Sequence, residues 1–111
     1  MRLEKDLVAA STIPLLLSIL TEGENYGYAI IQRVHELSGG NLQWTDGMLY
    51  PVLRWLEDRD CIRSEWREGQ GGPRRKYYRL EAKGRALLVQ QQDQWKAVNK
   101  TLTRAWKLHH A

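Results

Sequence analysis

The sequence predicts a mainly α-helical fold with one two-stranded β-hairpin and a long C-terminal helix. Apolar residues recur at helical spacing in several stretches of residues 3–56, which predicts amphipathic helices. Two alternating runs, 62–68 and 76–80, flank a loop rich in glycine and proline, as expected of a hairpin. From about residue 82 onward, apolar residues are spaced alternately by three and four positions, as in a helix that packs against a second helix.

The N-terminal region is predicted to contain two consecutive helical segments. Residues 3–10 form the first segment. Ser11 or Thr12 offers an N-cap for the second, which puts Pro14 in the first helical turn, where proline is tolerated. Gly23 ends the second segment, which is apolar on nearly every side and is therefore expected to be covered by more than its own domain.

Two shorter amphipathic helices are predicted next. The first extends from about Tyr26 to Ser38 and ends at a pair of glycines. Thr45 or Asp46 can cap the second, and Pro51 within it is expected to bend the helix or loosen its first turn. The inward stripe of this second helix consists of Leu49, Val52, Leu53 and Leu56.

The hairpin strands are predicted to place alternate residues on opposite faces. Tyr78 and Leu80 are expected to point inward from the second strand, which leaves Tyr77 exposed. Trp44, before the helix cap, and Trp66, in the first strand, are interpreted as packing residues, because a tryptophan buries a large apolar area.

The final helix is predicted to form a dimer seam. Its regularly spaced residues are Leu88, Gln91, Trp95, Val98, Leu102 and Ala105. A compact monomer has no need of such a seam. The residues expected at the interface between two protomers are Leu88, Trp95, Val98 and Leu102, together with Leu16 and Leu20 of the apolar N-terminal helix.

The two parts of the chain differ in charge. The 111 residues have a formal net charge of +4. Residues 1–62 contain five Lys or Arg and nine Asp or Glu, whereas residues 63–111 contain twelve and four. A basic half on a small protein indicates a polyanionic partner, most commonly nucleic acid, although a solvated basic face would give the same composition.

Other classes of function lack support in the sequence. Cys61 is the single cysteine and has no partners at zinc-ligand spacing, so no disulfide, metal site or cofactor is expected. No nucleophile motif, phosphate-binding loop or carboxylate pair in an apolar setting indicates catalysis, so the protein is not expected to be an enzyme. The N-terminus does not resemble a signal peptide, and the apolar run at residues 13–17 is too short to span a membrane, which favours the cytoplasm.

One helix and the hairpin that follows it form a pattern that indicates function. The helix displays Tyr50 and Arg54 on its outer face, and the hairpin loop leads into Arg74-Arg75-Lys76. A helix for the major groove and a cationic hairpin for the neighbouring backbone make up a winged helix-turn-helix. Residues 1–80 are therefore predicted to be the DNA-binding domain, and residues 81–111 the dimerisation helix.

The sequence resembles the PadR family of bacterial and archaeal transcriptional regulators. The shared motifs are Tyr26-Gly27-Tyr28, Gly47-Met48-Leu49-Tyr50-Pro51, Leu53, Leu56-Glu57, Gly71-Gly72-Pro73-Arg74-Arg75-Lys76-Tyr77-Tyr78-Arg79-Leu80 and Gly84-Arg85. The resemblance extends from residue 3 to about residue 106, and its specificity comes from the combination of the Gly-x-Leu-Tyr-Pro element with the basic wing. The single C-terminal helix is similar to the shorter branch of the family.

The resemblance implies a dimeric winged-helix regulator, with repression as the favoured role. Its partner would be double-stranded DNA with an inverted-repeat operator, read by the helix that contains Tyr50. The first and last helices would form the dimer interface, where some family members bind planar aromatic molecules and release DNA. Two residues depart from the family pattern: Met48 stands where Thr or Ser is frequent, and Glu81 where Thr usually caps the last helix.

The predicted DNA-binding residues are Gly47, Met48, Tyr50, Arg54, Arg74, Arg75 and Lys76. Tyr50 can donate to a phosphate or stack on a sugar, and its alternative is packing against the wing. Arg54 can reach a phosphate or a guanine edge, and its alternative is an ion pair with Asp58. The wing cations would supply the salt-dependent part of the affinity.

Two interpretations also remain for Trp95 and for the protein as a whole. Trp95 is either an anchor of the dimer interface, which is favoured, or one wall of a ligand slot between two symmetry-related rings. The protein is either a sequence-specific DNA-binding regulator or, as the alternative, a winged-helix module whose basic face binds an acidic protein. A duplex titration against salt separates these two functions, because only the first releases counterions from phosphates.

Overall fold

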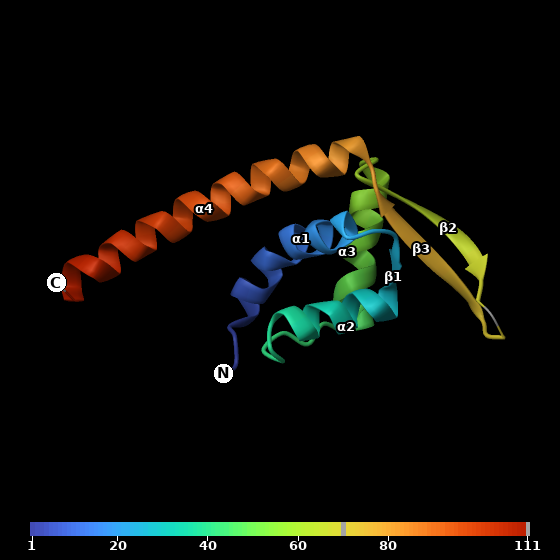
Figure 1. Ribbon diagram of the computed structural model, residues 1–111, viewed down its shortest axis with the longest axis horizontal. Helices are drawn as coiled ribbons and strands as arrows, with labels where there is room; N and C mark the ends of the chain where they lie inside the picture. The colour runs from blue at the N-terminus through green and yellow to red at the C-terminus, as the bar shows by residue number, and fades with distance from the viewer. Residues whose placement is uncertain (70, 111) are drawn as a thin grey trace.

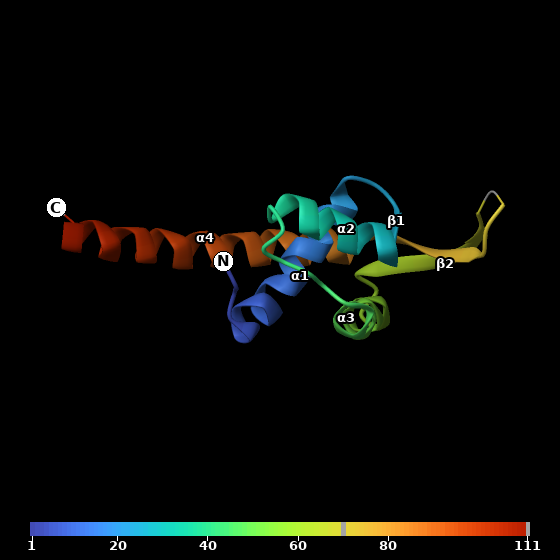
Figure 2. The ribbon, with the colours of Figure 1, turned by 90° about the horizontal axis from the view of Figure 1, so that it is seen from below.

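The computed structural model describes residues 1–69 and 71–110, so the Ala111 end of the predicted C-terminal segment lies outside the described residues (Figure 1). The elements are α1 (Lys5–Thr21), β1 (Asn25–Tyr26), α2 (Gly27–Leu37), α3 (Asp46–Asp58), β2 (Ile62–Glu68), β3 (Arg74–Leu80) and α4 (Ala82–His110). Helices α1 to α3 form the body, the β2–β3 hairpin extends from one end, and α4 extends past the other (Figures 1 and 2). The predicted helical fold with a hairpin wing and a long last helix is confirmed.

The hairpin belongs to a three-stranded antiparallel sheet with the order β1-β3-β2. In the added strand β1, Asn25 and Tyr26 pair with Tyr78 and Tyr77 of β3. A strand of two residues is too short for an alternating pattern, so the sequence did not predict it. Because α2 begins at the next residue, β1 connects the wing directly to the start of α2.

Helix α1 is continuous, so the predicted break at Ser11 and Thr12 is wrong. Both hydroxyls donate to the carbonyl oxygen of Val8 at 2.9 Å instead of capping a new helix. Pro14 therefore lies in the helix interior, where it removes one backbone hydrogen bond. The apolar residues that follow are almost completely buried, and this burial outweighs the local cost of the proline.

Three residues that the sequence placed at a dimer interface are buried within a single chain. Helix α1 packs against α2, β3 and α4. Leu16 is fully buried, Leu20 is 3% exposed, and Leu88 of α4 is 6% exposed. The prediction that these residues contact a second protomer is wrong, because their own chain already covers them.

Helix α3 begins at the predicted cap. The Thr45 Oγ1 atom accepts a hydrogen bond from the N–H of Met48 at 3.3 Å. Trp44, one residue earlier, is 4% exposed, which confirms it as a packing residue. The helix continues through Pro51, which lies on its exposed side. The buried residues of α3 are Leu49, Leu53 and Leu56.

A close backbone contact fixes the start of α4. The N–H of Glu81 donates to the carbonyl oxygen of Cys61 at 3.0 Å. A Cβ atom at Gly84 would lie 2.2 Å from the same oxygen, so only glycine allows this approach. After its first turns α4 leaves the body, as Figures 1 and 2 both show. Across residues 1–69 and 71–110, none of the helices combines the length and the apolar composition that a bilayer crossing requires.

Candidate nucleic-acid interface

The outer face of α3 presents predicted recognition residues to solvent. Tyr50 is 46% exposed, and Gly47 and Arg54 are exposed on the same helix. Met48 instead packs partly against the hydrophobic core. Within the described ranges of the chain, the guanidinium of Arg54 takes part in no ion pair, so Asp58 is not its partner. The helix therefore offers one phenol and one guanidinium without carboxylate neighbours bound to them.

The hydroxyl of Tyr50 lies at the start of α2. A Cβ atom added to Gly27 would lie 2.6 Å from Tyr50 Oη and 3.1 Å from Tyr50 Cζ. Gly27 is the first residue of α2, and Tyr26, at the N-cap, provides no side-chain hydrogen bond to the helix. The start of a helix has N–H groups without intrahelical partners and a partial positive charge. An anion beside Tyr50 would therefore meet both a phenol and a helix N-terminus.

Aromatic rings hold two of the wing cations on the face of the sheet that is turned toward α3. Trp66 pairs with Lys76 across the strands, and the guanidinium of Arg74 lies 5.7 Å from the Trp66 ring. The ammonium of Lys76 lies 5.9 Å from that ring and 5.7 Å from the ring of Tyr78. These are cation–π distances. Lys76 also approaches Glu57 of α3 at 3.9 Å.

Arg75 reaches the same region from the other face of β3, where it lies opposite Arg67. Alternation along β3 directs its side chain away from those of Arg74 and Lys76. Its guanidinium lies 4.5 Å from the ring of Tyr26, in β1. The three wing cations are thus spread around the junction between the wing and the start of α2.

One open hollow of about 540 Å³, here named the wing groove, lies among these groups. It is lined by Tyr26, Gly27, Tyr28, Tyr50, Trp66, Arg74, Arg75, Lys76 and Tyr78. Four of the predicted DNA-binding residues, Tyr50, Arg74, Arg75 and Lys76, therefore share one surface, whereas Gly47, Met48 and Arg54 lie on α3 outside the lining.

The interpretation of Trp66 as a packing residue is wrong. Its side chain is 56% exposed, because the hairpin has extended beyond the body at this point. The predicted alternation put Trp66 on the same face as Ile62 and Ser64, and this assignment holds. The sequence does not show that Trp66 lies opposite Lys76, because this pairing depends on the register of the two strands. Tyr28, also absent from the predicted site, is 66% exposed at the start of α2.

Tyr78 closes the inner end of the wing groove. It is 3% exposed and Leu80 is 8% exposed, which confirms both as inward residues. Burial, followed by the charges of Glu57 and Tyr50, raises the pKa of Tyr78 to about 12. The phenol therefore stays neutral well above the ordinary tyrosine range. Tyr77 is half-buried rather than exposed, because its ring packs edge-on against Tyr26 with centroids 5.4 Å apart.

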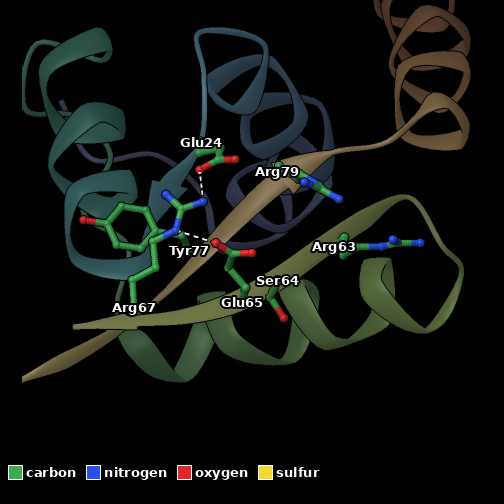
Figure 3. Close-up of a pocket in the computed structure, with 7 residues that line it drawn as sticks. All are labelled: Glu24, Arg63, Ser64, Glu65, Arg67, Tyr77 and Arg79. Carbon is green, nitrogen blue, oxygen red and sulfur yellow. Dashed lines mark hydrogen bonds and ion pairs between the residues drawn. The ribbon is translucent and has the colours of Figure 1, made fainter. Parts of the chain in front are cut away.

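The opposite side of the sheet, here named the outer face, has paired charges (Figure 3). Arg67 lies between Glu24 and Glu65 and forms an ion pair at 2.6 Å with each of them. Hydrogen bonds to Glu65 and then to Glu24 raise the pKa of Arg67. The pair with Glu24 also fastens β2 to the segment that leads into β1, so this cluster stabilises the base of the wing.

Two further arginines of the outer face share one carboxylate. Arg63 lies 3.1 Å from Glu81, and Arg79 lies 3.7 Å from the same residue. By contrast, among the described residues, neither Arg74 nor Arg75 forms an ion pair. The uncompensated positive charge of the wing is therefore concentrated around the wing groove.

Sequence comparison identifies the family. The sequence profile described as "Transcriptional regulator PadR-like family" matches residues 16–90, which include α2, α3 and the whole wing. The chain belongs to the PadR-like family of transcriptional regulators. Members of this family are DNA-binding transcriptional regulators, and the resemblance to the PadR family is confirmed.

Curated relatives of this PadR-like chain include one regulator. It is 30% identical over 80 residues to the transcriptional regulator YqjI of Escherichia coli K12, a match that covers 72% of this chain and 37% of YqjI. It is 27% identical over 97 residues to the uncharacterized protein X of Lysinibacillus sphaericus, covering 87% of this chain and 89% of that protein.

Solved structures of transcriptional regulators share the fold. A transcriptional regulator from Clostridium thermocellum matches with a TM-score of 0.83 and 25% identity, over 92% of this chain and 96% of that one. A PadR-like transcription factor from Bacteroides fragilis matches with a TM-score of 0.74 and 31% identity, over 90% of this chain and 94% of that one. The likeness therefore includes the long α4 as well as the winged domain.

A second, apolar groove of about 360 Å³ lies between α1 and α4 of this PadR-like chain. Its lining residues are Leu3, Leu7, Ser11, Pro14, Leu15, Ser18, Leu42, Gln92 and Trp95. Trp95 is half-buried, whereas Val98 and Leu102, further along α4, are 53% and 42% exposed. Of the predicted interface residues, Trp95, Val98 and Leu102 thus remain accessible to a partner.

Proposed function

We propose that this PadR-like regulator is a homodimeric, sequence-specific repressor that binds DNA through α3 and the wing groove. The observation that carries the proposal is the convergence of Tyr50, the start of α2 and three wing cations on one hollow. Carboxylates pair with Arg63, Arg67 and Arg79 on the outer face, so the wing groove is the more positive region. A negatively charged duplex is the partner that fits such an arrangement.

The two parts of the surface have different tasks in this proposal. Helix α3 enters the major groove, where Arg54 reads a base edge and Gly47 allows close approach of the backbone. Tyr50 and the N–H groups at the start of α2 bind a phosphate beside the groove. Arg74, Arg75 and Lys76 bind the neighbouring backbone and add affinity without sequence information.

The dimer is proposed to form through the exposed part of α4 and the groove beside α1. Trp95, Val98 and Leu102 follow the alternating spacing of three and four that suits a helix–helix seam. Leu7, at the edge of the apolar groove, is 48% exposed and would be covered by the same partner. Two-fold symmetry then places two copies of α3 on successive major grooves, so the operator is an inverted repeat with half-sites about 10 bp apart or a multiple of that.

Titration of the DNA just upstream of the protein's own gene tests DNA binding. We expect a gel shift in which the logarithm of the affinity falls linearly with the logarithm of the salt concentration, with a slope that corresponds to several phosphates. The alternative function, binding of an acidic protein partner by the basic face, predicts neither the shift nor the slope. A flat salt dependence would therefore overturn the proposed function.

Light scattering tests the dimer separately. Wild-type protein should have the mass of two chains at micromolar concentration, and replacement of Trp95 and Leu102 by Glu should give monomers or unfolded protein, because both charges would be buried at the seam. A folded wild-type monomer at this concentration would contradict the proposal.

A planar aromatic molecule is proposed as the releasing effector, bound in the apolar groove beside Trp95. Such a ligand should quench tryptophan fluorescence, and the quenching should be lost in Trp95→Ala. Quenching that is absent, or that persists in this variant, would leave Trp95 as an interface anchor only.

A further inference from the structure

Trp66 occupies a position that the packing of its own chain does not explain. Along the α3-facing side of the hairpin, Leu80 and Tyr78 are buried, but Trp66 at the next level is 56% exposed. Its partner across the strands is Lys76, and Arg74 lies beyond it toward the loop. A large apolar ring therefore stands in the mouth of the wing groove, surrounded by cations.

These surroundings restrict what can cover Trp66. Arg74 and Lys76 lie 5.7 Å and 5.9 Å from its ring. A basic or purely apolar partner would leave Arg74 without a counter-charge and Lys76 with only the carboxylate of Glu57 at 3.9 Å, which is costly. The DNA backbone supplies phosphates for the cations and the apolar faces of deoxyriboses for the ring, at alternating positions along one strand.

We propose that Trp66 is a DNA contact of the wing, with its ring packed on a deoxyribose while Arg74 and Lys76 bind the flanking phosphates. The ring has a second effect, because it restricts two long side chains that would otherwise lose more rotamer freedom on binding. This inference rests on the proposed DNA binding and adds to it a residue with no charge of its own.

The test measures duplex affinity and its salt slope for wild type, Trp66→Phe and Trp66→Ala. Trp66→Ala should lower the affinity about tenfold, in the range known for the loss of one aromatic contact to nucleic acid. It should also lower the salt slope by about one, because the two cations are no longer held together. Trp66→Phe keeps a ring and should keep most of the affinity and the slope. Thermal unfolding of all three should be similar, because the side chain is more than half exposed.

Trp55 provides a matched control. It is 39% exposed, and the guanidinium of Arg59 lies 3.8 Å from its ring, but it is outside the wing groove. Trp55→Phe should leave affinity unchanged and keep the fluorescence change on duplex addition, whereas Trp66→Phe should lose most of that change. Trp66→Ala with wild-type affinity, or with an altered oligomeric mass, would overturn the inference. Failure of the wild type itself to bind any duplex would instead overturn the proposed function.

Discussion

The carboxylate cluster of the outer face and the wing groove hold arginine in opposite ways. On the outer face, Arg67 is bound by Glu24 and Glu65 (Figure 3). Around the wing groove, Arg74 and Arg75 lie against the rings of Trp66 and Tyr26 instead. A carboxylate cancels the charge of an arginine, whereas an aromatic ring restrains its position and leaves the charge in place.

The wing thus contains one group of arginines that stabilises its base and another whose charge is not cancelled by a carboxylate. Net charge alone does not distinguish the two groups, and neither does the face of the sheet, because Arg75 lies directly opposite Arg67 across the strands. The neighbouring side chains make the difference: Glu65 and Glu24 bind Arg67, whereas Arg74 and Arg75 lie against the rings of Trp66 and Tyr26. A phosphate that approaches the wing groove therefore does not have to displace a carboxylate from Arg74 or Arg75.

Removal of the charges around the wing groove should have the largest effect. The triple variant Arg74→Ala, Arg75→Ala, Lys76→Ala should lose about a hundredfold in duplex affinity at 0.15 M salt, because each lost phosphate contact lowers the slope by about 0.9. The charge-matched control is Arg63→Ala, Arg67→Ala, Arg79→Ala on the outer face, which should be less stable to heat but should keep its salt slope. Equal loss of affinity in both triples, measured by fluorescence anisotropy, would remove the distinction between the two groups of arginines.

Arg54→Ala tests whether α3 contacts bases as well as phosphates. If Arg54 reads a base edge, its loss should cost roughly 1–3 kcal/mol of binding free energy and relax the preference at one position of each half-site. Arg75→Ala should weaken all duplexes nearly equally. Affinity selection from a randomised operator measures both effects. A uniform loss for Arg54→Ala would assign it to the phosphate-binding group.

The burial of Tyr78 predicts a pH dependence of folding. The pKa of Tyr78 is raised from 10.0 to about 12 in the folded state. The neutral phenol therefore contributes stability that is complete below pH 10 and is lost as pH rises toward 12, by about 2 kcal/mol in the free energy of unfolding. Urea unfolding between these pH values should show this loss in wild type and in Tyr77→Phe. It should be absent in Tyr78→Phe, and an unchanged slope in that variant would place the titration elsewhere.

Gly27→Ala should have the smallest effect and should act only on the wing-groove side. The added Cβ would lie 2.6 Å from Tyr50 Oη, and the exposed Tyr50 ring can move away. We expect little change in stability and a loss of affinity of about tenfold, or about 1.4 kcal/mol, because the phenol leaves the start of α2. In a Tyr50→Phe background, the same glycine substitution should cost less. Fully additive losses would show that the two residues act independently.

The sequence predicted the helices, the hairpin and the inward residues of the wing, because these depend on local periodicity. It failed where a result depends on what packs against a residue. Leu16 and Leu20 looked too apolar for one small domain, yet the first turns of α4, α2 and β3 together cover them. Pro14 marked a helix start by its local chemistry, but the burial of the residues after it favours a continuous α1.

The sequence predicted only part of the candidate site, because the rest also depends on what packs against each residue. Tyr50 and the wing cations stand out by residue type and position, so they could be selected from the sequence. Trp66 and Gly27 acquire their place only through the strand register and the approach of α3 to α2. No local pattern encodes a strand of two residues, so the role of Tyr26 as the support for Arg75 could not be foreseen.

The close contact between Gly84 and the carbonyl oxygen of Cys61 restricts the angle at which α4 leaves the winged domain. Cys61 directly precedes β2 and follows the turn after α3, so this contact lies beside both elements of the proposed DNA-binding surface. A helix of 29 residues is about 43 Å long, so a tilt of a few degrees at this contact displaces its far end by several ångströms. In a dimer held at that far end, the same geometry works in reverse: a change in how two α4 helices cross would alter the distance between the two recognition helices. In the proposed dimer, the spacing of the operator would therefore depend on a backbone contact between Gly84 and Cys61, far from any base.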